Sequence, residues 1–146
     1  MNNETSIEEK NCLFCKIIAG EIPAEKVYED EHSLAFLDIN PVNIGHTLLI
    51  PKKHTQNIFD TPSETLQNIV SALKIVSSAV KNGVNADGLN IINNNGGPAG
   101  QLVYHLHLHL VPRFTGDGFT HWHGKNYNEG EMSATAEKIK KIILDN

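Results

Sequence analysis

Between residues 104 and 111 the chain reads YHLHLHLV, so that histidine and leucine alternate three times. Alternation with a period of two is typical of a β-strand, in which successive side chains point to opposite faces. We therefore expect a strand over Leu102–Val111 that buries its leucines in the core and lines up His105, His107 and His109 on the other face. Neighbouring histidines would lie about 6.6 Å apart along such a strand.

This spacing constrains the chemistry of the three rings. Two of them could share one metal ion, but all three could not, because Zn–N bonds are about 2.0–2.1 Å long. A row of imidazoles along a bound molecule is the better interpretation. A neutral imidazole can attack phosphorus through one nitrogen, and a charged neighbour can bind phosphate oxygens or donate a proton, so the array suits phosphoryl or nucleotidyl transfer. The alternative is an exposed strand face that merely contains many histidines.

The clearest helix signal follows Thr61. Thr61 is expected at the N-cap, Pro62 at the first helical position and Glu64 in a capping box, with apolar residues at helical spacing up to a stop at Gly83. Other periodic segments predict helices over Glu9–Ala19 and Met132–Leu144, and strands over Lys26–Glu29, Ser33–Asp38, His46–Ile50 and Gly88–Asn93. Several hairpins between few helices indicate an α+β fold with a mainly antiparallel sheet.

Length and charge limit the remaining possibilities. The 146 residues fit one domain over 9–146, with a core at 12–113, a tail and helix at 114–146, and a flexible segment at 1–8. A net charge of −5 argues against non-specific nucleic-acid binding. No apolar run approaches the ~20 residues of a membrane span, and the N-terminus lacks a signal-peptide pattern, so we expect a cytoplasmic protein without membrane contact.

The loop Asn94–Gln101 contains three glycines and leads directly to the histidines. Glycines let backbone N–H groups approach an anion closely, although a hairpin connection uses the same residues.

Cys12 and Cys15 form a Cys-x-x-Cys pair with several interpretations. A redox pair, a disulfide and two inert packed thiols are alternatives. Zinc is another, because two thiolates and two imidazoles complete a tetrahedral site.

The segment His105–Val111 fits the signature of the histidine triad family, in which three histidines alternate with apolar residues. Cys12–Pro23, Phe36–Pro41, Gly45–His54 and Gly100–His105 also resemble this family, in its order. The chain is most similar to the HINT branch and its bacterial relatives. The resemblance implies an antiparallel five-stranded sheet with two main helices, and a homodimer whose two sheets join into one continuous sheet. Pro62–Lys81 and Gly88–Asn93 would supply the dimer contact.

The resemblance also implies roles for individual residues. His107 would attack the α-phosphorus of a purine nucleotide, His109 would contact the phosphate and assist the leaving group, and His105 would support the site beside His46. Asp38 would bind the ribose hydroxyls. The base would lie in an apolar pocket, and the glycine-rich loop would contact the substrate; the matching residues are Phe14, Ile17, Ile22, Phe36, Leu37, Ile39, Asn94, Gly100 and Gln101. Leu102 departs from the pattern, because the HINT branch often has a phosphate-binding serine there.

By the same resemblance, Cys12, Cys15, His54 and His105 would hold a structural zinc ion. The implied activity is hydrolysis of purine nucleoside phosphoramidates or acyl-nucleotides through a nucleotidyl-histidine intermediate. Alternatives are dinucleoside polyphosphate hydrolysis, nucleotide binding with negligible turnover, and redox chemistry at the cysteines. His121, Trp122 and His123 form a local cluster to which we assign no role.

Overall fold

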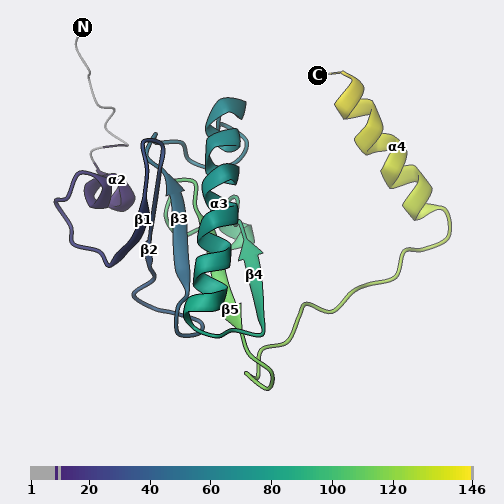
Figure 1. The fold of residues 1–146 in the computed structure, drawn as a ribbon. Helices are drawn as coiled ribbons and strands as arrows, with labels where there is room; N and C mark the ends of the chain where they lie inside the picture. The colour runs from purple at the N-terminus through teal and green to yellow at the C-terminus, as the bar shows by residue number, and fades with distance from the viewer. Residues whose placement is uncertain (1–8, 10, 146) are drawn as a thin grey trace, which may run out of the picture.

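The computed structural model describes residue 9 and residues 11–145, so the expected flexible segment 1–8 lies outside the described residues. An antiparallel five-stranded sheet forms the centre, in the order β1-β2-β3-β5-β4 (Figure 1). Its strands are β1 (Lys26–Glu29), β2 (Ser33–Leu37), β3 (Thr47–Pro51), β4 (Gly88–Ile92) and β5 (Leu108–Arg113). The helices are α2 (Leu13–Ile18), α3 (Ser63–Gly83) and α4 (Glu131–Leu144), with a short 3₁₀ turn at Gly97–Ala99. The expected α+β class and five-stranded antiparallel sheet are confirmed.

The sheet carries one helix on each face. Phe14 and Ile17 of α2 pack against one set of side chains from β2 and β3, which includes Phe36 and Leu48. The residues between them, Ala35 and Leu49, point to the opposite face and pack against α3. Alternate residues of β2 and β3 therefore enter two different cores, which is why these strands are apolar almost without interruption.

The start of α3 differs from the expected capping box. Pro62 holds the N-cap position, and no side chain caps the helix. The Thr61 hydroxyl turns back to the preceding loop, where it lies 2.6 Å from the Asn57 carbonyl oxygen and 2.7 Å from the Thr55 hydroxyl. The prediction that Thr61 caps the helix is wrong, because tertiary contacts of the loop compete for its hydroxyl.

The histidine segment is only partly a strand. β5 begins at Leu108, not at Leu102, and extends to Arg113. Strand pairing with β3 starts where Leu49 faces Leu108, and the residues before this pair lie in irregular backbone. The Leu106 N–H instead donates to the Thr55 carbonyl, 2.8 Å away. The expectation of three histidines on one regular strand is therefore wrong for its first half, because pairing with β3 stops at Leu108 although β3 continues to Pro51, and the Pro51 carbonyl accepts from the ring of His105 instead.

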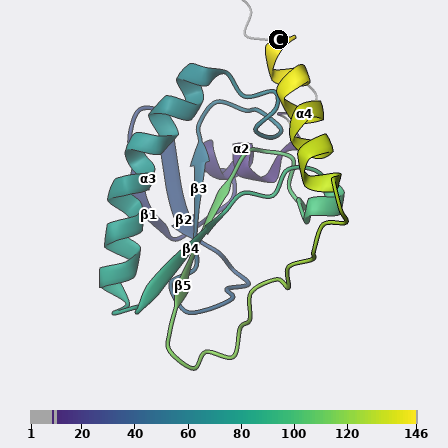
Figure 2. The ribbon, with the colours of Figure 1, turned by 90° about the vertical axis from the view of Figure 1, so that its right-hand side faces the viewer.

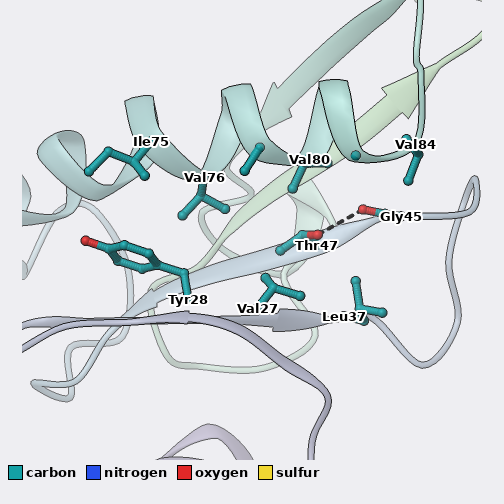
Figure 3. Close-up of a pocket in the computed structure, with 11 residues that line it drawn as sticks. Val27, Tyr28, Leu37, Gly45, Thr47, Ile75, Val76, Val80 and Val84 are labelled. Carbon is teal, nitrogen blue, oxygen red and sulfur yellow. Dashed lines mark hydrogen bonds between the residues drawn. The ribbon is translucent and has the colours of Figure 1, made fainter.

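A small apolar cavity of about 260 Å³ lies on the α3 side, where α3 crosses the ends of the first three strands (Figure 3). Gly45 closes one end with φ at +91°, and a Cβ there would lie 2.7 Å from a methyl carbon of Val84. Glycine at this position lets the loop before β3 pass close under the end of α3.

The expected C-terminal helix is confirmed as α4, and none of its residues is buried. Residues 114–130 carry α4 away from the sheet, on the side beyond β4 (Figure 1), and the rotated view shows α4 at the upper right with α3 at the left (Figure 2). Ile139 and Ile143 are 57% and 67% exposed. Among the described residues, no helix is both long and apolar enough to cross a membrane.

Candidate functional site

A cavity of about 400 Å³ opens between α2, the end of β2, the glycine-rich loop and the start of β5. His107 and His109 line it together with Asp38. Eleven of its lining residues were expected from the sequence, and the structure adds Leu13, Pro23, Asn40, Leu48, Leu102 and Val103. One wall is therefore apolar and aromatic, and the other carries two imidazoles and a carboxylate, which is a suitable arrangement for a base at one end and a phosphate at the other.

The His107 ring is held in one orientation. Its Nδ1–H donates to the His105 carbonyl oxygen, 2.7 Å away, so the lone pair is on Nε2. The Phe14 ring packs edge-on against it, with 5.3 Å between ring centroids. Burial lowers the pKa of His107, although the bond to His105 opposes this shift. A neutral ring with a free Nε2 lone pair is the form that acts as a nucleophile.

His109 is oriented by His46. The Val42 N–H donates to His46 Nδ1 over 3.1 Å, so the His46 proton is on Nε2. This nitrogen lies 3.0 Å from His109 Nδ1 and donates to it, which leaves the His109 proton on its own Nε2. Burial and the neighbouring rings of His107 and His46 lower the pKa of His109 to about 4. His109 thus presents an N–H group beside the lone pair of His107, with 4.9 Å between the ring centroids.

The expected position of His46 beside His105 is not what the structure has. His46 contacts His109, because the turn after Asp38 returns the chain at His46 next to the end of β2, where the Asp38 N–H donates to the His46 carbonyl. Burial is the main cause of the lowered pKa of His46. The carboxylate of Asp38 lies 3.8 Å from His46 Nε2.

Asp38, His46 and His109 together could in principle hold a metal ion, because one ligand atom from each lies within 4.8 Å of the others. The hydrogen bonds argue against it. His46 Nδ1 accepts from the Val42 N–H, so its Nε2 carries a proton and has no lone pair to offer. We interpret this group as a hydrogen-bonded chain.

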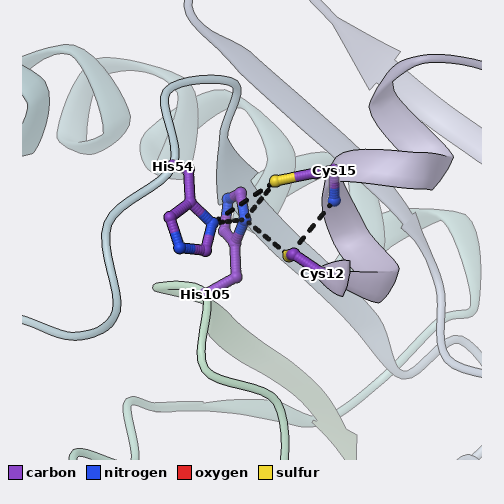
Figure 4. A group of neighbouring side chains, drawn as sticks. All are labelled: Cys12, Cys15, His54 and His105. Carbon is purple, nitrogen blue, oxygen red and sulfur yellow. Dashed lines mark hydrogen bonds between the residues drawn. The ribbon is translucent and has the colours of Figure 1, made fainter. Parts of the chain in front are cut away.

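A second cluster lies behind the triad and consists of Cys12, Cys15, His54 and His105 (Figure 4). The Nδ1 atoms of the two histidines are 3.3 Å apart, and the sulfur atoms lie 3.3–3.5 Å from them. Tetrahedral zinc with Zn–N bonds of about 2.05 Å and Zn–S bonds of about 2.3 Å requires N–N and N–S separations of about 3.3 and 3.5 Å. The donor set and its spacing therefore fit a closed zinc site.

Protonation in this cluster agrees with the same assignment. His105 donates from Nε2 to the Pro51 carbonyl over 2.8 Å, so the lone pair of Nδ1 points at the sulfurs. Burial raises the pKa of Cys15 to about 12, which is opposite to the lowered pKa of a redox-active thiol. Both cysteines are free thiols in the structure. The redox and disulfide interpretations therefore have less support than zinc.

The side chain of Gln101, which was expected to contact the substrate, makes its hydrogen bonds within the protein. Its amide oxygen accepts from the Gly96 N–H at 2.8 Å, and its amide nitrogen donates to the carbonyls of Gln56 and Val103. Gln101 is buried and holds the glycine-rich loop in shape, while Asn94 and Gly100 line the cavity.

Sequence reasoning missed Asn93, whose side-chain amide donates to the His107 carbonyl over 2.9 Å. No local pattern marks this asparagine, because its partner is fourteen residues away, just before β5. His121 and Trp122 line a separate cavity with Arg113 and Phe119, and His123 lies in the same exposed tail.

Comparison with known proteins gives consistent matches. Residues 19–116 match the model of the HIT domain. The crystal structure of a member of the HIT family from Bacillus subtilis has 44% sequence identity and a TM-score of 0.83, with 90% of this chain and 96% of that chain covered. A Zn-bound histidine triad family protein from Mycobacterium smegmatis has 39% identity and a TM-score of 0.72, with 92% and 99% covered. The adenylylsulfatase HINT3 of Arabidopsis thaliana is 41% identical over 110 residues, which cover 75% of this chain and 56% of that protein.

Proposed function

The chain belongs to the HIT domain family, whose members include nucleotide-binding hydrolases, and from this premise we propose that it hydrolyses purine nucleoside phosphoramidates or acyl-nucleotides through a nucleotidyl-His107 intermediate. One observation carries the proposal. The Nδ1–H of His107 is held by the His105 carbonyl, so a neutral Nε2 lone pair is available in the cavity.

The reaction takes two displacements at phosphorus. The purine base lies against Phe14 and Ile17, and Asp38 accepts hydrogen bonds from the ribose hydroxyls. His107 Nε2 forms a bond to the α-phosphorus while the bond to the leaving group breaks. The leaving group takes a proton from His109, which the bound phosphate has converted to its protonated form, so that His109 returns to the neutral ring. Water then attacks the same phosphorus, its proton passes to His109, and the N–P bond breaks to release the nucleoside monophosphate.

His107→Ala tests the proposal directly. Adenosine phosphoramidate turnover should fall by at least about a thousandfold, because the covalent route needs the Nε2 lone pair. The matched control is His32→Ala, which removes an exposed histidine from the opposite end of β2 and should retain full turnover. Rapid quenching and mass spectrometry should detect adenylylated His107 in the wild type only. Full turnover by folded His107→Ala would refute the mechanism.

The leaving group is a separate question. The similarity to the adenylylsulfatase HINT3 supports adenylyl sulfate, a phosphate–sulfate anhydride, as a further candidate substrate, and diadenosine polyphosphate hydrolysis remains the alternative. We expect the ratio of kcat/KM among adenosine phosphoramidate, adenylyl sulfate and diadenosine polyphosphate to rank the candidates. Tight AMP binding with no turnover of any of the three would instead favour a binding module.

We also propose a structural zinc ion on Cys12, Cys15, His54 and His105. The tetrahedral spacing of the four donor atoms supports it, and so does the Zn-bound relative. Four protein ligands leave no open position for substrate, so the ion would hold the loops together and leave catalysis to the triad. Metal analysis of the purified protein should find one zinc per chain, and much less after Cys12→Ser and Cys15→Ser together. A metal-free wild type would refute the site.

We also propose that the protein is a homodimer and that it is cytoplasmic. β4 is an edge strand, and it could pair with a second copy to continue the sheet. α4 lies beyond this edge with exposed apolar residues, and a helix of 14 residues is marginal in water by itself. Free Cys12 and Cys15 fit a reducing compartment. Analytical ultracentrifugation should find twice the chain mass, and deletion of residues 131–146 tests whether α4 contributes.

A further inference from the structure

His105 belongs to both sites at once. Its side chain lies among Cys12, Cys15 and His54, and its backbone carbonyl accepts the Nδ1–H of His107. The residue is fully buried. The side chain of one residue therefore contacts the donor cluster, and the backbone carbonyl of the same residue contacts the nucleophile.

The backbone around His105 has few other constraints. β5 begins at Leu108, so no sheet pairing holds residues 102–107. The Leu106 N–H donates to Thr55, and side-chain amides of Gln101 and Asn93 donate to the Val103 and His107 carbonyls. At His105 itself the anchors belong to its ring, which donates to the Pro51 carbonyl and packs edge-on against Phe14. The orientation of the His105 carbonyl thus depends largely on where its own ring is held.

Resting on the proposed function, we propose that His105 is a positioning residue that makes the proton position of His107 depend on the occupied Cys–His cluster. With zinc held by Cys12, Cys15 and His54, the ring of His105 stays in place and its carbonyl fixes the proton on His107 Nδ1. With the cluster empty, the ring keeps only its bond to the Pro51 carbonyl and its packing against Phe14, so it shifts more easily and the carbonyl shifts with it. His107 then distributes its proton over both nitrogens, and the form with the proton on Nε2 cannot attack phosphorus.

The ion in this proposal is structural but still affects turnover. Outer partners that orient a reacting group typically change activity by about 10–100-fold when removed. We expect the change in kcat and not in KM, because none of the three other cluster residues belongs to the base- and ribose-binding wall of the cavity.

The experiment measures the tautomer of His107 and turnover on the same samples. Wild-type protein is prepared with zinc, after treatment with a zinc chelator, and after zinc is returned, at a temperature where all samples are folded by circular dichroism. The ¹⁵N chemical shifts of His107 should show a single Nδ1–H tautomer with zinc and a mixture after chelation. The value of kcat for adenosine phosphoramidate should fall at least tenfold and recover with zinc, at constant KM.

Cys15→Ser is the matched variant, and it should reproduce the chelated state without a chelator present. Val76→Ala is the control, because Val76 is a buried residue of α3 in the other core, and its truncation lowers stability without touching either site. It should keep the wild-type tautomer and kcat.

Two outcomes overturn the proposal. One is an unchanged His107 tautomer in fully folded, zinc-free protein. The other is an equal loss of tautomer signal in Val76→Ala, which would trace the effect to general destabilisation. Failure of the proposed function can be distinguished from failure of this proposal. A protein inactive on all nucleotides would still show whether the tautomer of His107 changes when zinc is removed.

Discussion

Binding of AMP should raise the pKa of His109 strongly. In the free protein, burial and the rings of His107 and His46 lower this pKa to about 4, and Asp38 only partly opposes them. His109 is then neutral at pH 7, and a neutral imidazole is a poor acid for a leaving group. The phosphate of a bound nucleotide supplies the missing negative charge, so the substrate itself makes His109 a usable acid.

The size of the effect follows from the geometry. One negative charge about 4 Å from the ring contributes about 4 kcal/mol at an effective dielectric constant of about 20. This energy corresponds to about a thousandfold increase in the proton-binding constant of the ring. Because AMP binding then takes up a proton, AMP affinity should weaken as pH rises from about 4 to about 7, the window between the free and bound pKa values of His109.

NMR titration of ¹⁵N-labelled histidine, with and without saturating AMP, measures the change directly. The midpoint of the His109 resonances should move to higher pH in the sample with AMP. The same midpoint for His109 in free and bound protein would refute the reasoning, and another group would then have to protonate the leaving group.

Three further predictions concern stability. Buried His46 and His109 have lowered pKa values, so the folded state binds fewer protons than the unfolded state. Their contribution to stability should be complete above the ordinary histidine pKa and should be lost as pH decreases toward about 4. Urea titrations that show no such loss would contradict this prediction. Leu49→Ala removes a fully buried side chain and should cost about 2–5 kcal/mol in the free energy of unfolding, with a loss below 1 kcal/mol as the contrary result. Gly45→Ala should destabilise the protein because its Cβ meets Val84, and Val84→Ala should recover part of that loss in a double-mutant cycle; strict additivity would exclude the steric cause.

The periodic patterns of apolar residues predicted the strands and the C-terminal helix well. The bounds of β1 are as expected, those of β2, β4 and α4 differ by one residue at one end, and those of β3 differ by one residue at both ends. Periodicity reports which face of an element is apolar, and that information is local. The resemblance to the histidine triad family added the sheet and the residues that line the cavity, which the structure brings together around His107 and His109.

Contacts between distant segments were decided only by the tertiary structure. The alternation at His105 and His107 is that of a strand, but pairing with β3 stops at Leu108, and the ring of His105 joins the cysteines instead. His46 pairs with His109, and Gln101 holds a loop, because turns far apart in sequence bring their polar groups together. Such loops have no periodicity, and every buried polar group in them must find a partner from whichever segment packs beside it. The sequence therefore specified which histidines line the site, and tertiary packing decided which ring nitrogen of each histidine carries the proton.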